Sequence, residues 1–494
     1  MEHDYRSISR QLGVSYILNL LTYFLGPFLI LLLTRNLTLE QFGVYSIFSA
    51  TIAMFSVLLE LGVSQYVITK LPSFEYSIKV FSFFSLLFFV IIFVIISLLI
   101  IIFSPLQNFF IGLLKVGKYV FEFKLTLIIL GLESISRVVS SYLMALKKIE
   151  LANFLSFLKP LLLISTLSIF ILFYQLSLKL VLMLWIIVSA TILAFYLFFI
   201  FGDFTFFYIN HRRINLPLVR QALFFSIPLV PALACSWTIE FADRYILNFY
   251  SNPSNVGLYT LAFSLAAIVF SLSTIVSQVL YPHISESWGK KKNYVILFNA
   301  QLKYSLLILI PSLIGVFVMR EQFITLIAGV NYLKSANVLV ILLFFPFFAS
   351  FISIFYQANL LNNKTFKIFL VYLSGAVINI ILNILLIPKF FMYGAAFATI
   401  TSYFVMFLLV LWLSKDMMIR WNMRFIRPFR ILIAAIIMGV ILHILNPQTY
   451  IFKIFCVFFG ILIYISFLFI LGVFIKDEKM LITKIIDEFK KLFK

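Results

Sequence analysis

Long, uninterrupted apolar segments recur from one end of the chain to the other. One of them, from Val80 to Phe103, contains no charged residue and is longer than the ~20 apolar residues that a helix needs to span a bilayer. Hydrophobic residues make up 63% of the sequence and charged residues 11%, whereas a soluble domain is about half apolar and about a quarter charged. One water-soluble core cannot bury so much apolar surface, so lipid must be the solvent for most of it.

Only helices and closed β-barrels span membranes, because a segment in lipid must satisfy its own backbone polar groups. The apolar runs lack the alternation over ~10 residues that marks a barrel strand, so they favour helices. We therefore expect an all-α integral membrane protein with about fourteen spans. The first span is too long to be the apolar part of a signal peptide. The expected spans are 11–34, 42–69, 79–103, 119–146, 152–173, 180–201, 218–249, 254–284, 294–319, 335–361, 367–387, 392–413, 428–445 and 451–475.

Basic residues gather in the loops on one side of the expected membrane. The side that holds the N-terminus also holds Lys147, Arg212, Lys290–Lys292, Arg424 and the lysine-rich segment 476–494. Cytoplasmic loops carry an excess of Lys and Arg, so we expect a multi-pass protein of the cell membrane with both termini in the cytoplasm. The formal net charge of +20 follows from this bias and requires no nucleic-acid partner.

Two short patterns recur 214 positions apart. Gly43-Val44-Tyr45-Ser46 is followed at this shift by Gly257-Leu258-Tyr259-Thr260, and Tyr142-Leu143-Met144-Ala145 by Tyr356-Gln357-Ala358-Asn359. A repeat of six spans is even, so the two halves share one orientation, as in transporters built from parallel repeats. We expect an N-terminal lobe (1–215), a C-terminal lobe (216–415), two added spans (416–475) and an amphipathic tail helix on the cytoplasmic leaflet (476–494).

Several short motifs carry a resemblance to a known family. They are Arg35-Asn36-Leu37-Thr38-Leu39-Glu40-Gln41-Phe42-Gly43-Val44-Tyr45, Glu60-Leu61-Gly62, Ile227-Pro228 with Trp237, Asp243-Arg244-Tyr245-Ile246-Leu247 and Val256-Gly257-Leu258-Tyr259. In these motifs the chain resembles the polysaccharide transporters, the O-antigen and capsule flippases of the MATE-like superfamily. The resemblance implies fourteen helices with two six-helix lobes. It also implies movement of a polyprenyl-diphosphate-linked oligosaccharide from the inner to the outer leaflet by alternating access.

Ionised residues inside the expected spans are candidate functional groups. A charge at the bilayer centre costs at least ~2.5–3.5 kcal/mol, so each should face the protein interior or a wet cavity. Glu133 and Arg137 are spaced i, i+4, as are Glu240 and Arg244, so each pair can meet on one helix face. Each pair is either a self-neutralising structural pair or an arginine that contacts an anion once its carboxylate releases it.

Four other intramembrane charges complete the set. Lys159 and Lys303 lie in the inner parts of their spans, where a lysine either extends to the membrane surface or binds a diphosphate as a compact point charge. Glu60 and Asp243 have no evident partner and are candidate proton or sodium sites. The candidate substrate-binding residues are Arg137, Arg244, Lys159, Lys303 and Arg35 of the loop motif, and the candidate ion-coupling residues are Glu60, Asp243, Glu133 and Glu240.

No motif in the sequence points to an enzyme or a cofactor. There is no Gly-Lys-Ser/Thr phosphate loop and no nucleophile elbow, and the histidines show no metal-ligand spacing. We therefore expect a transporter coupled to protons or sodium ions, with glycan polymerases or glycosyltransferases as candidate partners. Two alternatives stay open. A multidrug or cation exporter of the sister family should have a carboxylate-dominated cavity, and a glycolipid-processing enzyme should have a large external loop.

Overall fold

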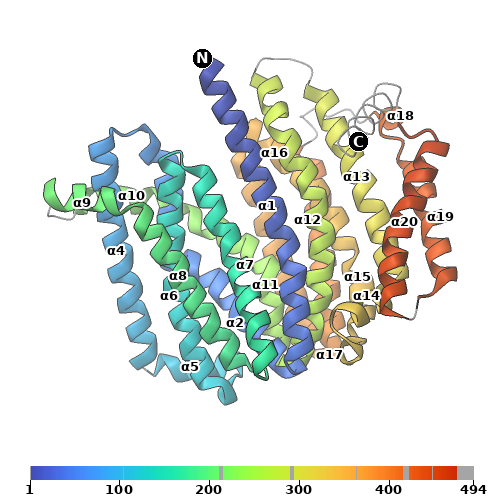
Figure 1. Ribbon diagram of the computed structural model, residues 1–494, viewed down its shortest axis with the longest axis horizontal. Coiled ribbons are helices and arrows are strands. Elements are labelled where there is room, and N and C mark those ends of the chain that lie inside the picture. The colour runs from blue at the N-terminus through green and yellow to red at the C-terminus, as the bar shows by residue number, and fades with distance from the viewer. Residues whose placement is uncertain are drawn as a thin grey trace. The chain divides into compact units, whose positions relative to one another are not determined.

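The computed structural model describes residues 2–103, 105–210, 215–289, 294–362, 364–414, 422–447 and 449–474, and these residues form helices joined by short connections (Figure 1). The first part contains α1 (Glu2–Asn36), α2 (Leu39–Leu59), α3 (Val63–Lys70), η1 (Leu71–Ser73), α4 (Tyr76–Phe103), α5 (Leu106–Leu114), η2 (Gly117–Tyr119), α6 (Val120–Ala145), α7 (Ile149–Phe173), α8 (Leu178–Phe199) and α9 (Phe201–Asn210). The rest contains α10 (Leu216–Ser226), η3 (Ile227–Leu229), α11 (Val230–Tyr250), α12 (Pro253–Gly289), α13 (Tyr294–Val318), α14 (Arg320–Ile327), η4 (Val330–Tyr332), α15 (Ser335–Leu342), α16 (Phe344–Leu361), α17 (Thr365–Leu413), α18 (Met423–Ile426), α19 (Pro428–Leu445) and α20 (Tyr450–Ile470).

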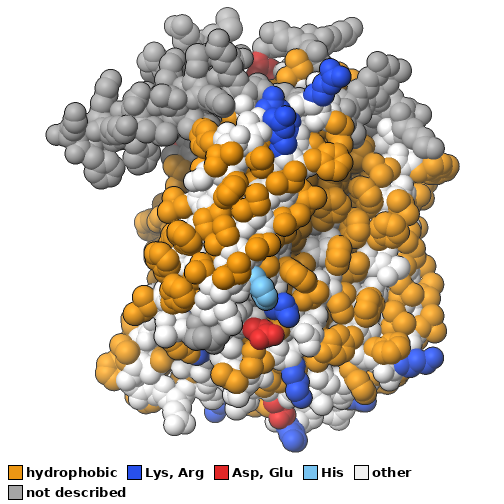
Figure 2. Space-filling view, turned by 90° about the vertical axis from the view of Figure 1, so that its right-hand side faces the viewer, with side chains coloured by type: hydrophobic (Ala, Val, Ile, Leu, Met, Phe, Trp, Pro, Cys, Tyr) orange, Lys and Arg blue, Asp and Glu red, His pale blue; other side chains and the backbone are white. Residues whose placement is uncertain are grey.

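The expected membrane-spanning helices are confirmed. Among the described residues, 13 helical segments are long and apolar enough to cross a membrane. Figure 2 shows hydrophobic side chains over most of one face, with charged side chains gathered toward its two ends. Such a band is what a protein surface presents to the hydrocarbon core of a bilayer. The expected tail helix at 476–494 lies outside the described residues.

The longest helix, α17, accounts for the difference between 13 segments and the fourteen expected. It has 49 residues, which at ~1.5 Å per residue is more than twice the ~30 Å hydrocarbon thickness of a bilayer. Its backbone leaves the helical conformation at Phe391, where φ is 48° and ψ is −124°. The kink lies between the spans expected at 367–387 and 392–413, so α17 consists of two membrane-spanning arms.

The helix boundaries repeat with the shift of 214 residues seen in the sequence. Helix α1 begins at Glu2 and ends at Asn36, and the α10–α11 segment begins at Leu216 and ends at Tyr250. The same shift carries α4 onto α13, α5 onto α14 and α8 onto the second arm of α17. The expected repeat is thus present in the order and bounds of the helices. Helices α19 and α20 follow it as additional elements.

The N-terminal turns of α2 and α12 show how the repeated sequence sets the repeated structure. Thr38 caps α2: its hydroxyl accepts from the Gln41 backbone N–H at 3.2 Å, and the Gln41 side chain accepts from the Thr38 N–H at 3.3 Å. This reciprocal capping box fixes where the helix begins. At the equivalent position before α12, the Asn252 side chain accepts from the Asn255 N–H at 3.0 Å.

The chain divides into two compact units. Unit 1 consists of residues 1–264 and 369–406, and unit 2 of residues 265–368 and 407–494. In unit 1, α1 packs along α7, and α6 packs on α2, α3 and α8. In unit 2, α13, α19 and α20 run side by side around a buried apolar cluster that includes Leu306, Met438 and Leu442 (Figure 1). The lobe boundaries expected at residues 215 and 415 stay a prediction.

One break in the helices of unit 1 differs between the two halves of the repeat. The apolar run over 42–69 predicts a single span, but the helix is interrupted between Leu59 and Val63. Leu61 and Gly62 both have positive φ, 52° and 69°. Glycine adopts this conformation at no steric cost, whereas for Leu61 it is strained. Such strained residues cluster at functional sites. The equivalent stretch of α12 continues as helix.

Candidate functional site

A polar cavity of about 410 Å³ opens within unit 1, beside this helix break. Its walls come from α3, α6, α7 and α8. Serine side chains are frequent in these walls because α6 carries serines on neighbouring turns of one face. The lining residues are Ser64, Gln65, Ile68, Glu133, Ser136, Arg137, Ser140, Ser141, Met144, Leu155, Ser156, Lys159, Ser189, Ile192 and Tyr196.

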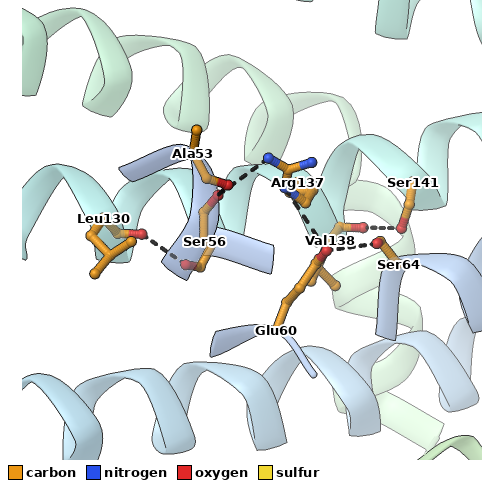
Figure 3. Close-up of polar contacts among 9 residues, drawn as sticks. Ala53, Ser56, Glu60, Ser64, Leu130, Arg137, Val138 and Ser141 are labelled. Atoms are coloured by element: carbon orange, nitrogen blue, oxygen red, sulfur yellow. Dashed lines mark hydrogen bonds and ion pairs between the residues drawn. The ribbon is translucent and has the colours of Figure 1, made fainter. Parts of the chain in front are cut away.

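Arg137 of α6 is held at the cavity wall by the end of α2 (Figure 3). Its Nε lies 3.8 Å from Oε1 of Glu60, and an Nη donates to the Ser56 hydroxyl at 3.2 Å. The Ser64 hydroxyl donates to the same Glu60 oxygen at 2.8 Å. The Glu60 side chain is 2% exposed, whereas the Arg137 side chain is 46% exposed. The carboxylate therefore anchors the guanidinium from behind and leaves its other edge facing the cavity.

A second ion pair lies in the wall of the same cavity, and its carboxylate is one turn before Arg137 on α6. Lys159 Nζ of α7 lies 2.5 Å from Oε1 of Glu133, and the Ser189 hydroxyl of α8 donates to that oxygen at 2.8 Å. The Lys159 and Glu133 side chains are 27% and 16% exposed. This pair joins α6, α7 and α8 around one carboxylate.

These contacts correct two expectations from the sequence. Glu133 and Arg137 were expected to pair with each other, but each pairs across to another helix, because α7 and the end of α2 bring opposite charges to them. Glu60 was expected to lack a partner, but it binds Arg137 and Ser64. Lys159 does not extend to the membrane surface, because Glu133 holds its ammonium group inside the cavity wall.

A separate cluster in unit 1 surrounds Asp243 of α11. This side chain is buried, and it accepts hydrogen bonds from the hydroxyl groups of Tyr259 and, at 3.4 Å, of Thr399. Its other oxygen accepts from the Arg244 backbone N–H at 2.8 Å. The expectation that Asp243 has no partner was therefore wrong. The repeated Gly-Leu-Tyr-Thr pattern at 257–260 was the signal that could have identified Tyr259.

Arg244 is buried and does not form the expected pair with the carboxylate of Glu240. Its Nε donates to the Thr260 hydroxyl at 3.3 Å, and an Nη donates to the backbone carbonyl of Glu240 at 3.4 Å. The guanidinium carbon lies 4.6 Å from the ring centre of Phe241 and 5.4 Å from that of Phe263. Two aromatic rings therefore lie against this cation, in addition to its hydrogen-bond acceptors. The Glu240 side chain is exposed.

The remaining candidates are not among the residues that line the polar cavity. Lys303 is fully buried on α13 of unit 2, where its ammonium group lies 6.0 Å from the ring centre of Tyr304. Arg35 is exposed in the last turn of α1. The structure thus brings four of the nine predicted residues into one site: Glu60, Glu133, Arg137 and Lys159. The serines that complete this site were not predicted, although Ser136, Ser140 and Ser141 recur at helical spacing within one span.

Comparison with known proteins places this chain in a family. Residues 32–337 match the family described as polysaccharide biosynthesis protein. The match covers more than half of the chain and includes the helix break, the polar cavity, and Asp243 with Tyr259. The chain belongs to this family. The expected resemblance is therefore confirmed.

Curated relatives match parts of this chain. It is 29% identical over 209 residues to the uncharacterized membrane protein MJ1068 of Methanocaldococcus jannaschii, with 41% of this chain and 40% of that protein covered. It is 27% identical over 165 residues to Agl15 of Haloferax volcanii, named a probable low-salt glycan biosynthesis flippase, with 33% and 35% covered. It is 30% identical over 169 residues to AglR, a probable flippase of the same organism, with 32% and 34% covered. The chain thus spans less than half the length of each of these relatives.

Solved structures establish the fold of this family member. The lipid II flippase MurJ in an inward closed conformation matches with a TM-score of 0.74 at 16% identity, over 92% of this chain and 97% of MurJ. An inward-facing multidrug resistance MATE transporter of the MOP superfamily matches with a TM-score of 0.61 at 12% identity, over 80% and 94%. The expected MATE-like helical fold is confirmed.

Proposed function

We propose that this protein is a flippase that moves a polyprenyl-diphosphate-linked oligosaccharide from the cytoplasmic to the outer leaflet of the cell membrane by alternating access. Family membership supports a role in polysaccharide assembly, and the fold supports a transporter. The observation that carries the proposal is the polar cavity of unit 1. It combines a half-exposed arginine, a lysine and many hydroxyl groups in an otherwise apolar protein.

The charges of this cavity suit a diphosphate. Arg137 is anchored by Glu60 through Nε and by Ser56 through one Nη, so its outer edge is free to bind phosphate oxygens. A planar guanidinium can bind two oxygens of one anion. Lys159 of α7 supplies a second cation in the cavity wall, and the serines can donate to the remaining oxygens. Both cations are balanced by carboxylates, so the empty cavity carries no large net charge.

We further propose that transport is coupled to the movement of an ion. Glu60 and Asp243 are the principal ion-binding residues, and Glu133 and Glu240 are further candidates. Oε2 of Glu60 is buried and has no hydrogen-bond partner among the described residues. It lies where α2 ends, and broken helices in transporters supply carbonyl groups that bind small cations. A proton or sodium ion at Glu60 would compete with Arg137 for this carboxylate, so the ion and the arginine would occupy it in turn.

Purified protein in lipid vesicles tests the proposal directly. We expect it to move a fluorescent polyprenyl-diphosphate oligosaccharide from one leaflet to the other, measured by enzymatic release of the sugar on the outside. Arg137→Ala should lower the initial rate about tenfold or more, because hydrogen bonds to charged groups are worth about 1.5–3 kcal/mol. Arg137→Lys should recover part of it, since a point charge replaces a planar fork. The matched control is Arg320→Ala, which removes an arginine paired with Glu321 on α14 of unit 2.

The same vesicles separate this function from that of a MATE-type exporter of cations. A cation exporter requires a cavity dominated by carboxylates, whereas the polar cavity here holds two cations and, with Glu60 behind them, two carboxylates. Transport of a cationic dye, without movement of the lipid-linked sugar, would favour the exporter and contradict the proposal. Interaction with glycan polymerases or glycosyltransferases stays a prediction.

A further inference from the structure

Unit 1 contains a second cavity, of about 510 Å³, whose walls are almost entirely hydrocarbon and aromatic. The lining residues come from α2, α4, α5, α6, α11 and α17. The hydroxyls of two of them, Thr51 and Tyr245, lie 2.9 Å apart in a mutual hydrogen bond, and Thr238 donates to the Ala234 carbonyl at 2.8 Å. Of the polar atoms in the walls, the indole N–H of Trp237 is buried without an acceptor among the described residues.

Helix α6 lines both cavities, one after the other. Phe123, Leu127 and Leu130 face the apolar cavity, whereas Glu133 and Arg137 face the polar one. Leu130 and Glu133 are three residues apart, which is about 4.5 Å along a helix axis. The two cavities therefore adjoin along one face of α6.

Helix α2 follows the same order. Thr51, Met54 and Phe55 line the apolar cavity, and the next residue, Ser56, binds Arg137 of the polar cavity. On both helices, residues of the apolar cavity are therefore followed within one turn by residues that line the polar cavity or bind its arginine. A single elongated molecule with an anionic group at one end and a hydrocarbon chain beyond it matches this order of surfaces.

The apolar cavity is suited to a hydrocarbon chain rather than to water. A buried water needs two to four polar partners, and cavities lined by apolar side chains stay dry. An empty cavity would leave its lining without dispersion contacts on one side. Its volume lies within the ~300–1,000 Å³ typical of ligand sites. In a membrane, the apolar groups available to fill it are lipid chains.

We propose that this apolar cavity binds the isoprene units nearest the diphosphate of the lipid-linked substrate while the diphosphate lies in the polar cavity. This rests on the proposed function. The expected topology supports it, because the C-terminal, polar half of α6 then lies toward the cytoplasm and the apolar half toward the outer side. A lipid in the cytoplasmic leaflet likewise has its headgroup toward the cytoplasm and its chain toward the middle of the bilayer. The protein thus recognises the substrate by its chain as well as by its charge.

Binding measurements on the full-length protein in detergent test this inference. Two probes carry the same diphosphate-linked sugar, one with a polyprenyl chain and one with an ethyl group in its place. Wild-type protein should bind the polyprenyl probe about tenfold more tightly or better, since each buried methylene adds to affinity. Ala242→Trp should fill the cavity, remove most of this gain and leave the affinity for the ethyl probe within about twofold. Ala194→Trp, at an exposed position on α8, is the matched control and should change neither affinity.

The outcomes separate this inference from the proposed function. If wild-type protein binds both probes equally, the cavity does not bind the chain, although the flippase function stands. If Ala242→Trp weakens both probes alike, the substitution acts on the fold or on the polar cavity, and the inference fails. If wild-type protein binds neither probe, the proposed function fails together with the inference.

Photolabelling provides a second measurement. It uses wild-type protein only, so it does not depend on whether a variant folds. A polyprenyl diphosphate with a diazirine in its second isoprene unit should label peptides that contain Met54 or Leu127, and excess unlabelled substrate should prevent this. A phospholipid with a diazirine in its acyl chain should label these peptides weakly. Equal labelling by the phospholipid that the substrate does not displace would show a site for bulk lipid and overturn the inference.

Discussion

The backbone nitrogen of Gly257 lies 3.2 Å from the point that a Cβ atom would occupy on Gly43, and the nitrogen of Gly43 lies 3.3 Å from the corresponding point on Gly257. The two glycines are equivalent under the 214-residue shift. A second pair of contacts is also reciprocal. The would-be Cβ of Gly43 meets the backbone carbonyl of Pro253, and the would-be Cβ of Gly257 meets the backbone carbonyl of Leu39, the residue equivalent to Pro253. Reciprocal contacts of this kind mark a two-fold axis. The local axis of the repeat therefore passes between the first turns of α2 and α12.

This contact leads to a prediction for Gly43→Ala. The added methyl group would overlap the Pro253 carbonyl, which is backbone and cannot turn aside. We expect a loss of about 1–3 kcal/mol in the free energy of unfolding, the usual range for overpacking, seen as a lower thermal unfolding temperature in detergent.

Gly26→Ala is the matched control for this prediction. Gly26 also lies within a helix, α1, but apart from its chain neighbours and the backbone of its own helix, no heavy atom of the described residues lies within 4 Å of its would-be Cβ. There alanine should be neutral, or should stabilise the helix by about 0.5–1 kcal/mol. Equal unfolding temperatures for the two variants would show that the contact between Gly43 and α12 does not restrict the fold.

The Glu133–Lys159 pair gives a second prediction, on stability. Lys159→Met should leave the Glu133 carboxylate, 16% exposed, with Ser189 as its remaining partner, and lower the free energy of unfolding by about 1–3 kcal/mol. Adding Glu133→Gln should recover most of that loss, because removing both charges costs less than stranding one. Thermal unfolding of both single variants and the double variant measures the coupling. Simply additive losses would mean that the two side chains do not stabilise each other.

The helices and their repeat were predictable from the sequence because they depend on local patterns. Spans follow from the lengths of the apolar runs, and the capping box of Thr38 and Gln41 marks the start of α2. The kink at Phe391 also lies in the short gap expected between two spans.

The partners of the intramembrane charges were not predictable in the same way. The spacing of Glu133 and Arg137 satisfied the i, i+4 rule, but a helix face says nothing about which other helices pack against it. Lys159 and Glu60 are brought to these residues by the packing of α7 and α2–α3 on α6. The interruption at Leu61 was hidden for a related reason, since only the three-dimensional backbone shows a leucine with positive φ.

Membrane orientation is the subject of the third prediction. Lys147 is exposed after α6 on the expected cytoplasmic side, and Lys118 is exposed before α6 on the expected outer side. With Cys235 and Cys456 replaced by serine, Lys118→Cys should react with an impermeant maleimide in intact cells. Lys147→Cys should react only after the membrane is permeabilised. The reverse pattern would invert the topology and place the polar cavity in the outer half of the membrane.

The last prediction concerns coupling through Glu60 and Asp243. Transport of an anionic headgroup against a gradient requires an energy source, and one charge that crosses ~100 mV gains ~2.3 kcal/mol. Glu60 has one oxygen engaged by Arg137 and Ser64 and the other without a partner among the described residues, while Asp243 is held by Tyr259 and Thr399. Glu60→Gln should therefore make translocation in proteoliposomes independent of an imposed proton or sodium gradient and leave substrate binding within about threefold, because Arg137 keeps its charge. Asp243→Asn should have the same effect if both carboxylates bind the ion.

Ser140→Ala, which removes a hydroxyl of the cavity but no charge, is the control and should keep the gradient dependence of the wild type. If wild type and both carboxylate variants respond equally to the gradient, neither residue couples transport to ions, and flipping driven by the substrate's own concentration gradient becomes the better account.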